Sequence, residues 1–536
     1  MNKKQINLLL VGALVLTKKV IGFVIYAPFL WIAFLNEDFL DILWQNPKNF
    51  LQCFASFGMP YGVYWRPVTQ SINALTYYFC GFSPFVFHLE NILFHVGGGV
   101  ILFYFIYLVS KHKVFSYVST VIFLTLPGHI ISVAWLPGRT DLLLTFFLVL
   151  ALFLMYLGQE KSKPLYYYLA AVSFLFAIWS KELAYAGAIL PLVFILIKPE
   201  KKWIGISIKA VLIGSLIIGM SLLARRIIFG GTPFNSVNFA DFTAMDLLKN
   251  FCIYPALLFF SPEYLEVLVY KLKSGSAEPY LLAIGIALFI ALVIINFVKS
   301  TPESKKYFFS GILIYLILIA PALTELNRWN TYAASAGLAI ALGSLATLSK
   351  KWYNIAYITV IGLIVLISSL YINSQGDDWV MASNKCTRIL KTTEKLNFGA
   401  YKSIRLWGLP DKYNRINLMK SGNGEAFHYY AQTKSFDTDA PVRSEIYTNS
   451  TFSISNSSSS KKFIKLTNGR FIPWKSQSRS ILVNENFSGK FFGIDYAITN
   501  RWLSGKYISE LRLTNLHISR DTLDVWFAGS KFAILN

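Results

Sequence analysis

Two neighbouring carboxylates, Glu37 and Asp38, directly follow the first apolar stretch of the chain. An acid at the mouth of a membrane helix costs free energy, so such residues are usually kept for function. A carboxylate there can take a proton from a hydroxyl nucleophile, which is the task of a general base. The sequence leaves open which of the two would act. The alternative is that both only cap a helix end.

Cationic side chains that could bind a phosphate follow in four separate segments. Arg139, Lys181 and Arg328 lie at the ends of apolar stretches, and Arg66 lies in the polar segment before the second stretch. Arginine binds phosphate oxygens in pairs, whereas lysine acts as a point charge. Three structural alternatives stay open: an Arg139–Asp141 pair, a Lys181–Glu182 pair, and an Arg328 that only extends its stem to the membrane surface.

Histidines form a second group of candidate residues. His88, Asn91 and His95 are spaced i, i+3 and i+7, which places them on one face of a helix, and His129 follows later. We expect interhelical hydrogen bonds or phosphate contacts from them, with a metal site as the weaker alternative. The four cysteines lie far apart without metal-ligand spacing, so no metal or other cofactor is predicted.

The composition indicates the kind of scaffold that must position these residues. Of 536 residues, 55% are hydrophobic and only 15% are charged, whereas soluble proteins carry about a quarter. The formal net charge of +22 lies largely in short loops between apolar stretches, as the positive-inside rule requires. This pattern indicates an integral membrane protein in contact with lipids, and it argues against a nucleic-acid partner.

Apolar stretches predict about eleven transmembrane helices. They cover residues 8–35, 87–109, 114–131, 141–158, 165–180, 183–198, 203–223, 281–298, 307–323, 332–349 and 352–372. Lysine clusters lie between alternate stretches, at 111–113, 159–163, 198–202, 299–306 and 350–351. The positive-inside rule places these loops, and with them the N-terminus, on the cytoplasmic side. The sequence predicts no cleavable signal peptide. The loops 36–86 and 224–280 then lie outside, with 250–270 on or dipping into the outer leaflet.

The composition changes after the last apolar stretch and predicts two domains. Residues 1–372 form the polytopic α-helical domain, and residues 373–536 carry short alternating apolar runs and many Gly, Asn, Ser and Lys residues. This pattern is typical of a soluble, β-rich domain, which the topology places outside the membrane.

Motifs from several of the predicted outer loops occur in a recognisable order. They are Tyr64-Trp65-Arg66-Pro67, the run from His88 to His95, Pro127-Gly128-His129, the run from Trp135 to Leu143, Ser180-Lys181-Glu182, Arg328-Trp329 and Ser335-Ala336-Gly337. Together they resemble the GT-C glycosyltransferases, within them the branch of the protein O-mannosyltransferases and their transmembrane, TPR-bearing relatives. Residues 405–430 look like the tails of bacterial members, so the resemblance implies a bacterial inner-membrane protein.

The resemblance implies an inverting transfer of sugar from a polyprenyl-phosphate donor to a hydroxyl at the extracytoplasmic face. The acceptor would be a protein, a glycolipid or a polysaccharide. Glu37 or Asp38 would be the base, the four cations would bind the donor phosphate, and the histidines, Asn91, Asp141 and Glu182 would support the substrate. The chain departs from the family in Glu37, Leu126 and Ile131, and it lacks the TPR repeats. Two alternatives remain: a transporter or flippase of lipid-linked sugars, and a scaffold that binds a surface polymer.

Overall fold

The computed structural model describes the chain in two compact units. It describes residues 22–35, 37–44, 52–55, 64–229, 243–260, 262–324, 326–346 and 351–393, together with ten strands between 403 and 534. The first unit comprises residues 1–32 and 45–377, and the second comprises 33–44 and 378–536. Parts of the predicted span 8–35, of the outer loops 36–86 and 224–280, and of the tail 405–430 lie outside the described residues.

Among the described residues, six helices are long and apolar enough to cross a membrane. They are α5 (Pro84–Ser110), α8 (Arg139–Lys161), α11 (Lys201–Phe229), α14 (Glu278–Lys299), α15 (Pro302–Ile319) and α17 (Trp352–Thr393). A bent pair, α6 (Lys113–Thr125) and the segment Pro127–Ala134, makes a seventh if it forms one span. The prediction of several helices long and apolar enough to cross a membrane is therefore confirmed, while the number eleven stays a prediction.

Further apolar helices coincide with the remaining predicted spans but are shorter. They are the helix Gly22–Trp31 with η1 (Ala27–Trp31), α9 (Pro164–Ser180), η4 (Glu182–Leu192) with α10 (Val193–Ile197), and α16 (Thr331–Ser344). Short segments of the first unit include α3 (Gln52–Ala55), α4 (Pro67–Cys80), η2 (Pro127–His129), α7 (Ile130–Ala134), η3 (Leu136–Gly138), η6 (Ala320–Ala322) and η7 (Arg328–Asn330).

Proline positions determine where several of these helices begin and where one span bends. Proline lies in the first turn of α4, α5, α9, α14 and α15, where its missing N–H would have no partner in any case. Pro127 separates α6 from the next helical segment, and the two axes differ by 47°. The Gly128 N–H donates to the carbonyl of Leu258 at 2.7 Å, so the backbone after α12 (Ala244–Leu257) lies against the bend.

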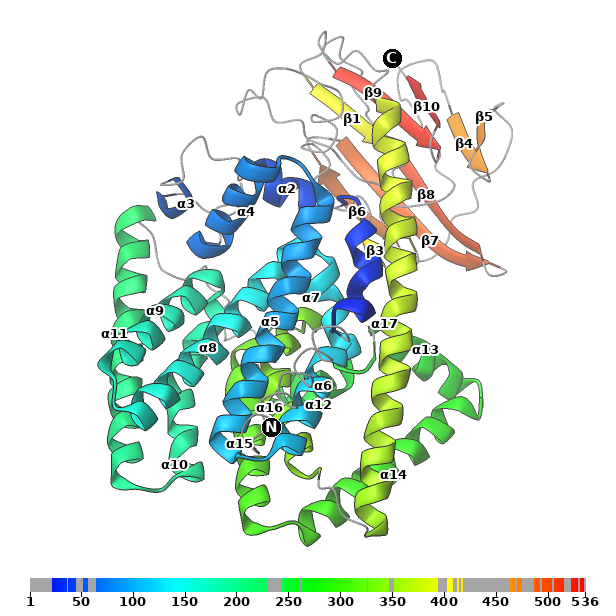
Figure 1. Cartoon of the computed structure of the whole chain (residues 1–536). Helices are drawn as coiled ribbons and strands as arrows, with labels where there is room; N and C mark the ends of the chain where they lie inside the picture. The colour runs from blue at the N-terminus through cyan, green and yellow to red at the C-terminus, as the bar shows by residue number, and fades with distance from the viewer. Residues whose placement is uncertain are drawn as a thin grey trace. The chain divides into compact units, whose positions relative to one another are not determined.

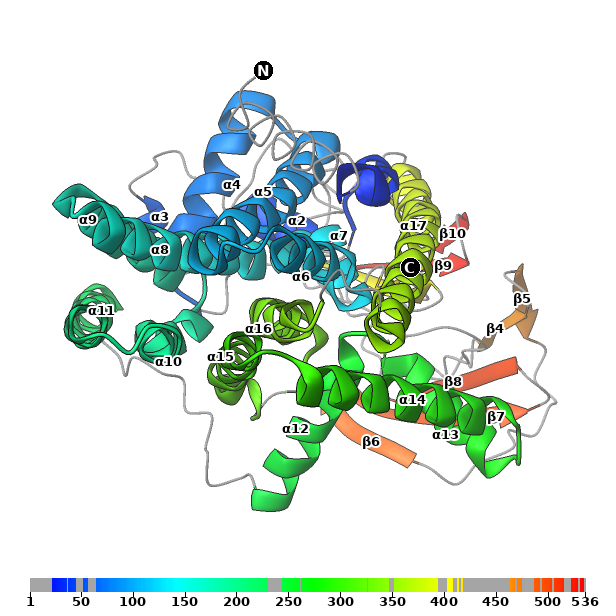
Figure 2. The same ribbon diagram turned by 60° about the horizontal axis from the view of Figure 1, so that its bottom comes forward.

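The helices of the first unit close into a ring. Neighbours in contact run α5, α6, α16, α15, η4 with α10, α11, α9, α8 and back to α5. Figures 1 and 2 both show α15 beside α16 and α8 beside α9. At the α15–α16 contact, a Cβ on Gly311 would lie 2.6 Å from the carbonyl oxygen of Gly337, so the two backbones touch. Small residues allow this close approach, which is the usual way helices associate in lipid.

The predicted outer-leaflet segment 250–270 contains two short helices. These are α12 (Ala244–Leu257) and α13 (Pro262–Lys273), and neither is long enough to count as a span. The C-terminal part of α12 packs on the ring, where the Tyr254 hydroxyl donates to the Ala322 carbonyl at 2.7 Å. Only 6% of the apolar window of α14 is buried, and its other residues are exposed or partly exposed.

The basic clusters lie together at one end of the ring. Glu160 pairs with Lys198 at 2.9 Å and also lies in the electric field of Lys202 and Lys111. The Tyr307 hydroxyl, next to Lys306, donates to the Val109 carbonyl at the end of α5. Asn296 at the end of α14 donates to the Tyr353 carbonyl at the start of α17. The loops that the sequence assigned to one side therefore share one end of this unit.

The second unit combines helix α2 (Glu37–Trp44), the C-terminal part of α17 and the strands. The Ala33 N–H donates to the Ser383 hydroxyl at 3.0 Å, which ties the segment before α2 to α17. With 42 residues, α17 is about 63 Å long, roughly twice what the hydrocarbon requires.

The strands form four small sheets. Parallel pairing joins β1 (Ser403–Trp407) to β9 (Thr522–Ala528), and β10 (Lys531–Ile534) pairs antiparallel with β9. The hairpins are β2 (Lys412–Tyr413) with β3 (Ile416–Asn417), and β4 (Phe463–Thr467) with β5 (Arg470–Trp474). The meander contains β6 (Asn486–Phe491), β7 (Ile494–Leu503) and β8 (Lys506–Thr514). Whether these sheets make one folded β-rich domain stays a prediction.

Candidate functional site

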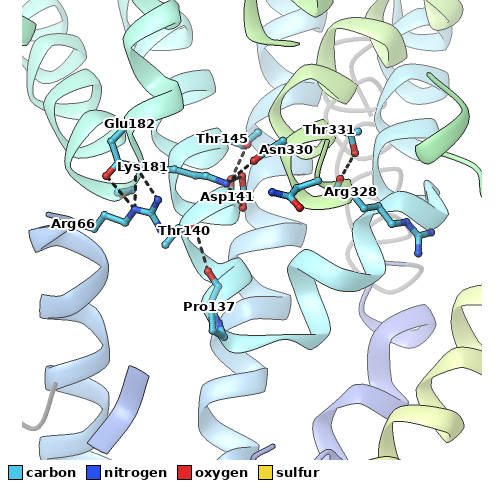
Figure 3. Close-up of polar contacts among 12 residues, drawn as sticks. Arg66, Pro137, Thr140, Asp141, Thr145, Lys181, Glu182, Arg328, Asn330 and Thr331 are labelled. Atoms are coloured by element: carbon cyan, nitrogen blue, oxygen red, sulfur yellow. Dashed lines mark hydrogen bonds and ion pairs between the residues drawn. The ribbon is translucent and has the colours of Figure 1, made fainter. Parts of the chain in front are cut away.

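Two ion pairs lie close together at the opposite end of the ring from the lysine clusters. Lys181 Nζ lies 2.7 Å from Asp141, and Arg66 Nη2 lies 2.8 Å from Glu182 (Figure 3). Asp141 and Glu160 are separated by 19 residues of α8, which is about 29 Å of helix. The network and the basic end therefore lie about one hydrocarbon thickness apart.

The Lys181–Asp141 pair is buried and its hydrogen bonds are complete. Lys181 donates to both carboxylate oxygens of Asp141, at 2.7 and 2.9 Å, and to Asn330 Oδ1 at 3.1 Å. An ammonium group has three N–H donors, so each of them has a partner here. Burial lowers the pKa of Lys181, and the Asp141 carboxylate opposes that shift.

The Arg66–Glu182 pair is more open to solvent. The two side chains are 17% and 24% exposed, and Arg66 uses Nε and Nη2 toward the carboxylate. Its guanidinium also lies over the Tyr64 ring, 4.2 Å from the ring centre. Burial alone would raise the pKa of Glu182, but the Arg66 charge outweighs it and lowers that pKa. Burial would likewise lower the pKa of Arg66, and Glu182 raises it instead.

These partners correct one structural alternative that the sequence left open. Lys181 and Glu182 do not form a pair with each other, because each has a different partner. The backbone at Lys181 is extended, with φ −162° and ψ 142°, and successive side chains in such a conformation point to opposite sides. The Ser180 carbonyl next to this link accepts a hydrogen bond from Thr69 at the start of α4.

Arg139 is a buried centre of hydrogen bonds, and it does not pair with Asp141. Its guanidinium donates to Asn91, Asn73 and the Phe87 carbonyl, each at 2.7 Å, and lies 2.9 Å from Glu90. The residue is 0% exposed. The pair with Asp141 is therefore corrected to one with Glu90, since residues two apart on a helix do not face each other.

Arg328 begins η7, and its side chain points away from Asp141 and Lys181 (Figure 3). It donates to the Pro127 carbonyl at 2.8 Å and to the Leu257 carbonyl at 3.3 Å. These bonds connect the bent α6 span, the end of α12 and η7. The structure therefore brings Arg66, Lys181, Asp141 and Glu182 together and places the Arg328 guanidinium elsewhere on this unit.

The predicted histidine face of α5 is buried. The carbonyl of Leu124 can only accept, so the neutral His95 ring donates from Nε2 and accepts at Nδ1 from the Tyr332 hydroxyl, at 2.6 Å. His129 Nε2 donates to Ser335, because the serine proton already binds the Tyr332 carbonyl. Neither nitrogen of the buried His88 has a hydrogen-bond partner among the described residues.

The candidate bases lie in the second unit, in the first turn of α2. Asp38 is 1% exposed, and its carboxylate accepts the Leu35 N–H at 3.0 Å. Glu37 is half-buried. A third acid, Asp41, is buried one turn later and was not among the sequence candidates.

Small apolar cavities lie inside the ring. Two adjoining pockets share the lining residues Phe105, Leu152, Leu190, Ile314 and Ile340. One pocket extends to Val109 and Ile197 at the basic end, and the other to Thr145 and Ala333. Thr145 donates to the backbone carbonyl of Asp141 at 2.8 Å, so the second pocket reaches within one helical turn of the Lys181–Asp141 pair.

Several residues of the network were not found from the sequence. They are Asn73, Glu90, Asn330, Tyr332 and Arg225, whose charge acts on Tyr185 beside Glu182. Glu90 lies inside the motif from His88 to His95, so its charge at the end of an apolar helix was a usable signal. Asn330 follows Arg328-Trp329 directly, but a neutral amide carries no comparable signal.

Among the described residues, no group of three or more His, Cys, Asp or Glu side chains could hold a metal ion. No protein-family model matches the chain, and no curated protein matches it either.

Proposed function

We propose that this protein is an inverting membrane glycosyltransferase that uses a polyprenyl-phosphate sugar. The observation that carries the proposal is a compact network of buried charges one helical turn from an apolar cavity, inside a ring of apolar helices. A lipid-linked sugar needs both features, because its hydrocarbon tail avoids water and its phosphodiester requires cations. Buried ionisable residues in membrane proteins are costly and usually functional.

The proposed reaction needs one base and charge stabilisation. The acceptor hydroxyl attacks the anomeric carbon and passes its proton to the carboxylate of Glu37 or Asp38, with the bond from that carbon to the phosphate oxygen breaking on the opposite face. The leaving group is the polyprenyl phosphate, whose charge a cation can stabilise without a general acid. The donor sugar supplies the bond that breaks, so no cofactor is required.

We further propose the topology in which this reaction would run. About eleven crossings would place the basic end in the cytoplasm and the ion-pair network at the extracytoplasmic face of a bacterial inner membrane. The strands after α17 would form an extracytoplasmic β-rich domain. The acceptor would be a protein hydroxyl, a glycolipid or a polysaccharide.

The test uses purified full-length protein in proteoliposomes and a radiolabelled polyprenyl-phosphate sugar. Transfer of label to an acceptor, or release of free sugar, with formation of polyprenyl phosphate supports the proposal. Movement of intact donor across the bilayer supports the alternative, a flippase. Glu37→Gln and Asp38→Asn separate the two base candidates, and retained transfer by both variants and by the double variant would refute the proposed mechanism.

A further inference from the structure

The count of hydrogen-bond donors distinguishes Arg66, Arg139 and Lys181, three of the four cations that the sequence assigned to a phosphate. Lys181 has a partner for each of its three N–H groups. Arg139 is completely buried, with its three nitrogens directed at Asn91, Asn73, Glu90 and the Phe87 carbonyl. A phosphate could bind either residue only by displacing partners from a closed interior.

Arg66 differs from both in its donors and in its exposure. Nε and Nη2 donate to Glu182, whereas Nη1 has no partner among the residues that the structure describes. The side chain is 17% exposed, and the Tyr64 ring that covers one face of its guanidinium is 38% exposed. A planar guanidinium stacked on an aromatic ring keeps its edge oriented for bidentate contact with an anion.

Glu182 occupies the edge of this guanidinium that an anion would use. Oε2 of its carboxylate accepts from Nε at 3.2 Å and from Nη2 at 2.8 Å, and Oε1 accepts from Nε at 3.4 Å. Nε and Nη2 form the edge of an arginine that can bind two phosphate oxygens. Because Glu182 is itself 24% exposed, it can turn toward water when another anion arrives. Asp141 has no such freedom, since its side chain is 2% exposed.

We propose that Arg66 is the group that receives the phosphate of an anionic ligand, and that Glu182 is an internal competitor that occupies the guanidinium in the unliganded protein. The inference rests on the proposed function only for the nature of that ligand, a polyprenyl-phosphate ester. Ligand binding then exchanges one carboxylate for one phosphate. The neighbouring Lys181–Asp141 pair stays intact and supports the site.

The test is isothermal titration calorimetry of inorganic phosphate into purified full-length protein in detergent at neutral pH. Glu182→Gln removes the competing charge and keeps the side-chain shape. We expect roughly fivefold tighter phosphate binding, the size of a partly exposed ion pair. Arg66→Met should abolish the gain in the double variant, and Glu182→Asp should give an intermediate gain if the Gln variant does not fold.

The matched control is Glu160→Gln at the basic end. Glu160 pairs with Lys198 at 2.9 Å and the two side chains are 38% and 24% exposed, so the chemistry and exposure are similar. The control should leave phosphate affinity unchanged. The same affinity in Glu182→Gln, Glu182→Asp and wild type would overturn the inference and identify the pair as a structural link between α4 and η4.

A failure of this inference can be told apart from a failure of the proposed function. Transfer of labelled sugar with unchanged phosphate affinity in Glu182→Gln rejects the competitor role and keeps the enzyme. Tighter phosphate binding without bond cleavage keeps the anion site and rejects the transferase.

Discussion

Replacing Arg139 with lysine tests whether the buried guanidinium holds the helices together. Lysine keeps the positive charge but carries it on a single nitrogen, whereas the Arg139 guanidinium contacts four partners from three nitrogens. A lysine has three N–H groups for these four partners, so at least one of Asn91, Asn73, Glu90 and the Phe87 carbonyl then lacks a donor. Each such loss costs about 1–3 kcal/mol, so we expect Arg139→Lys to lower the free energy of unfolding by about 3 kcal/mol.

The assay is reversible unfolding of the purified protein in mixed micelles, followed by tryptophan fluorescence. The control is Arg226→Lys, since Arg226 is exposed at the end of α11, and its effect should stay below about 0.5 kcal/mol. Phosphate affinity of the folded Arg139→Lys variant should equal that of the wild type. A loss of stability below about 1 kcal/mol, or a tenfold weaker phosphate affinity with stability unchanged, would refute this interpretation of Arg139.

Three further outcomes follow from other contacts. Lys181→Met leaves Asp141 buried without its cation and should lower the free energy of unfolding by about 3–5 kcal/mol. A double variant with Asp141→Leu should recover much of this loss, and no recovery would contradict a pairwise effect. Gly337→Ala should destabilise the protein by about 1–3 kcal/mol, because its Cβ would meet the backbone of α15. The control is Gly285→Ala on α14, which has open space around it and should have no measurable cost. Equal effects would argue against close packing of α15 and α16. Because the pKa of Glu182 is lowered in the folded protein, its stabilising contribution is present at neutral pH and is lost as the pH falls through that lowered pKa. Between pH 6 and pH 3, the free energy of unfolding of the wild type should therefore fall by up to about 1 kcal/mol more than that of Glu182→Gln. The same fall in both proteins would contradict this prediction.

The candidate site was predictable in its residue types and only partly in its contacts. Asp141, Lys181 and Glu182 lie at the ends of apolar stretches, where charge is expensive, and Arg66 lies in an outer-loop motif; the structure brings the four together. The helical periodicity of α5 also predicted that His88 and His95 would share a face. Asn330 could not be found, because a neutral amide becomes important only through the lysine that lies beside it.

The sequence by itself determined the helical membrane character and the grouping of the lysine loops. Both depend on local composition, since about 20 apolar residues suffice for a span and each loop carries its own charge. The choice of partners was decided only by the tertiary structure. Arg139 and Asp141 lie two residues apart on one helix and face different neighbours, which turns one toward Glu90 and the other toward Lys181. Neighbours in space, and not neighbours in sequence, neutralise charges that cannot reach water, because an ion pair requires contact within a few ångströms.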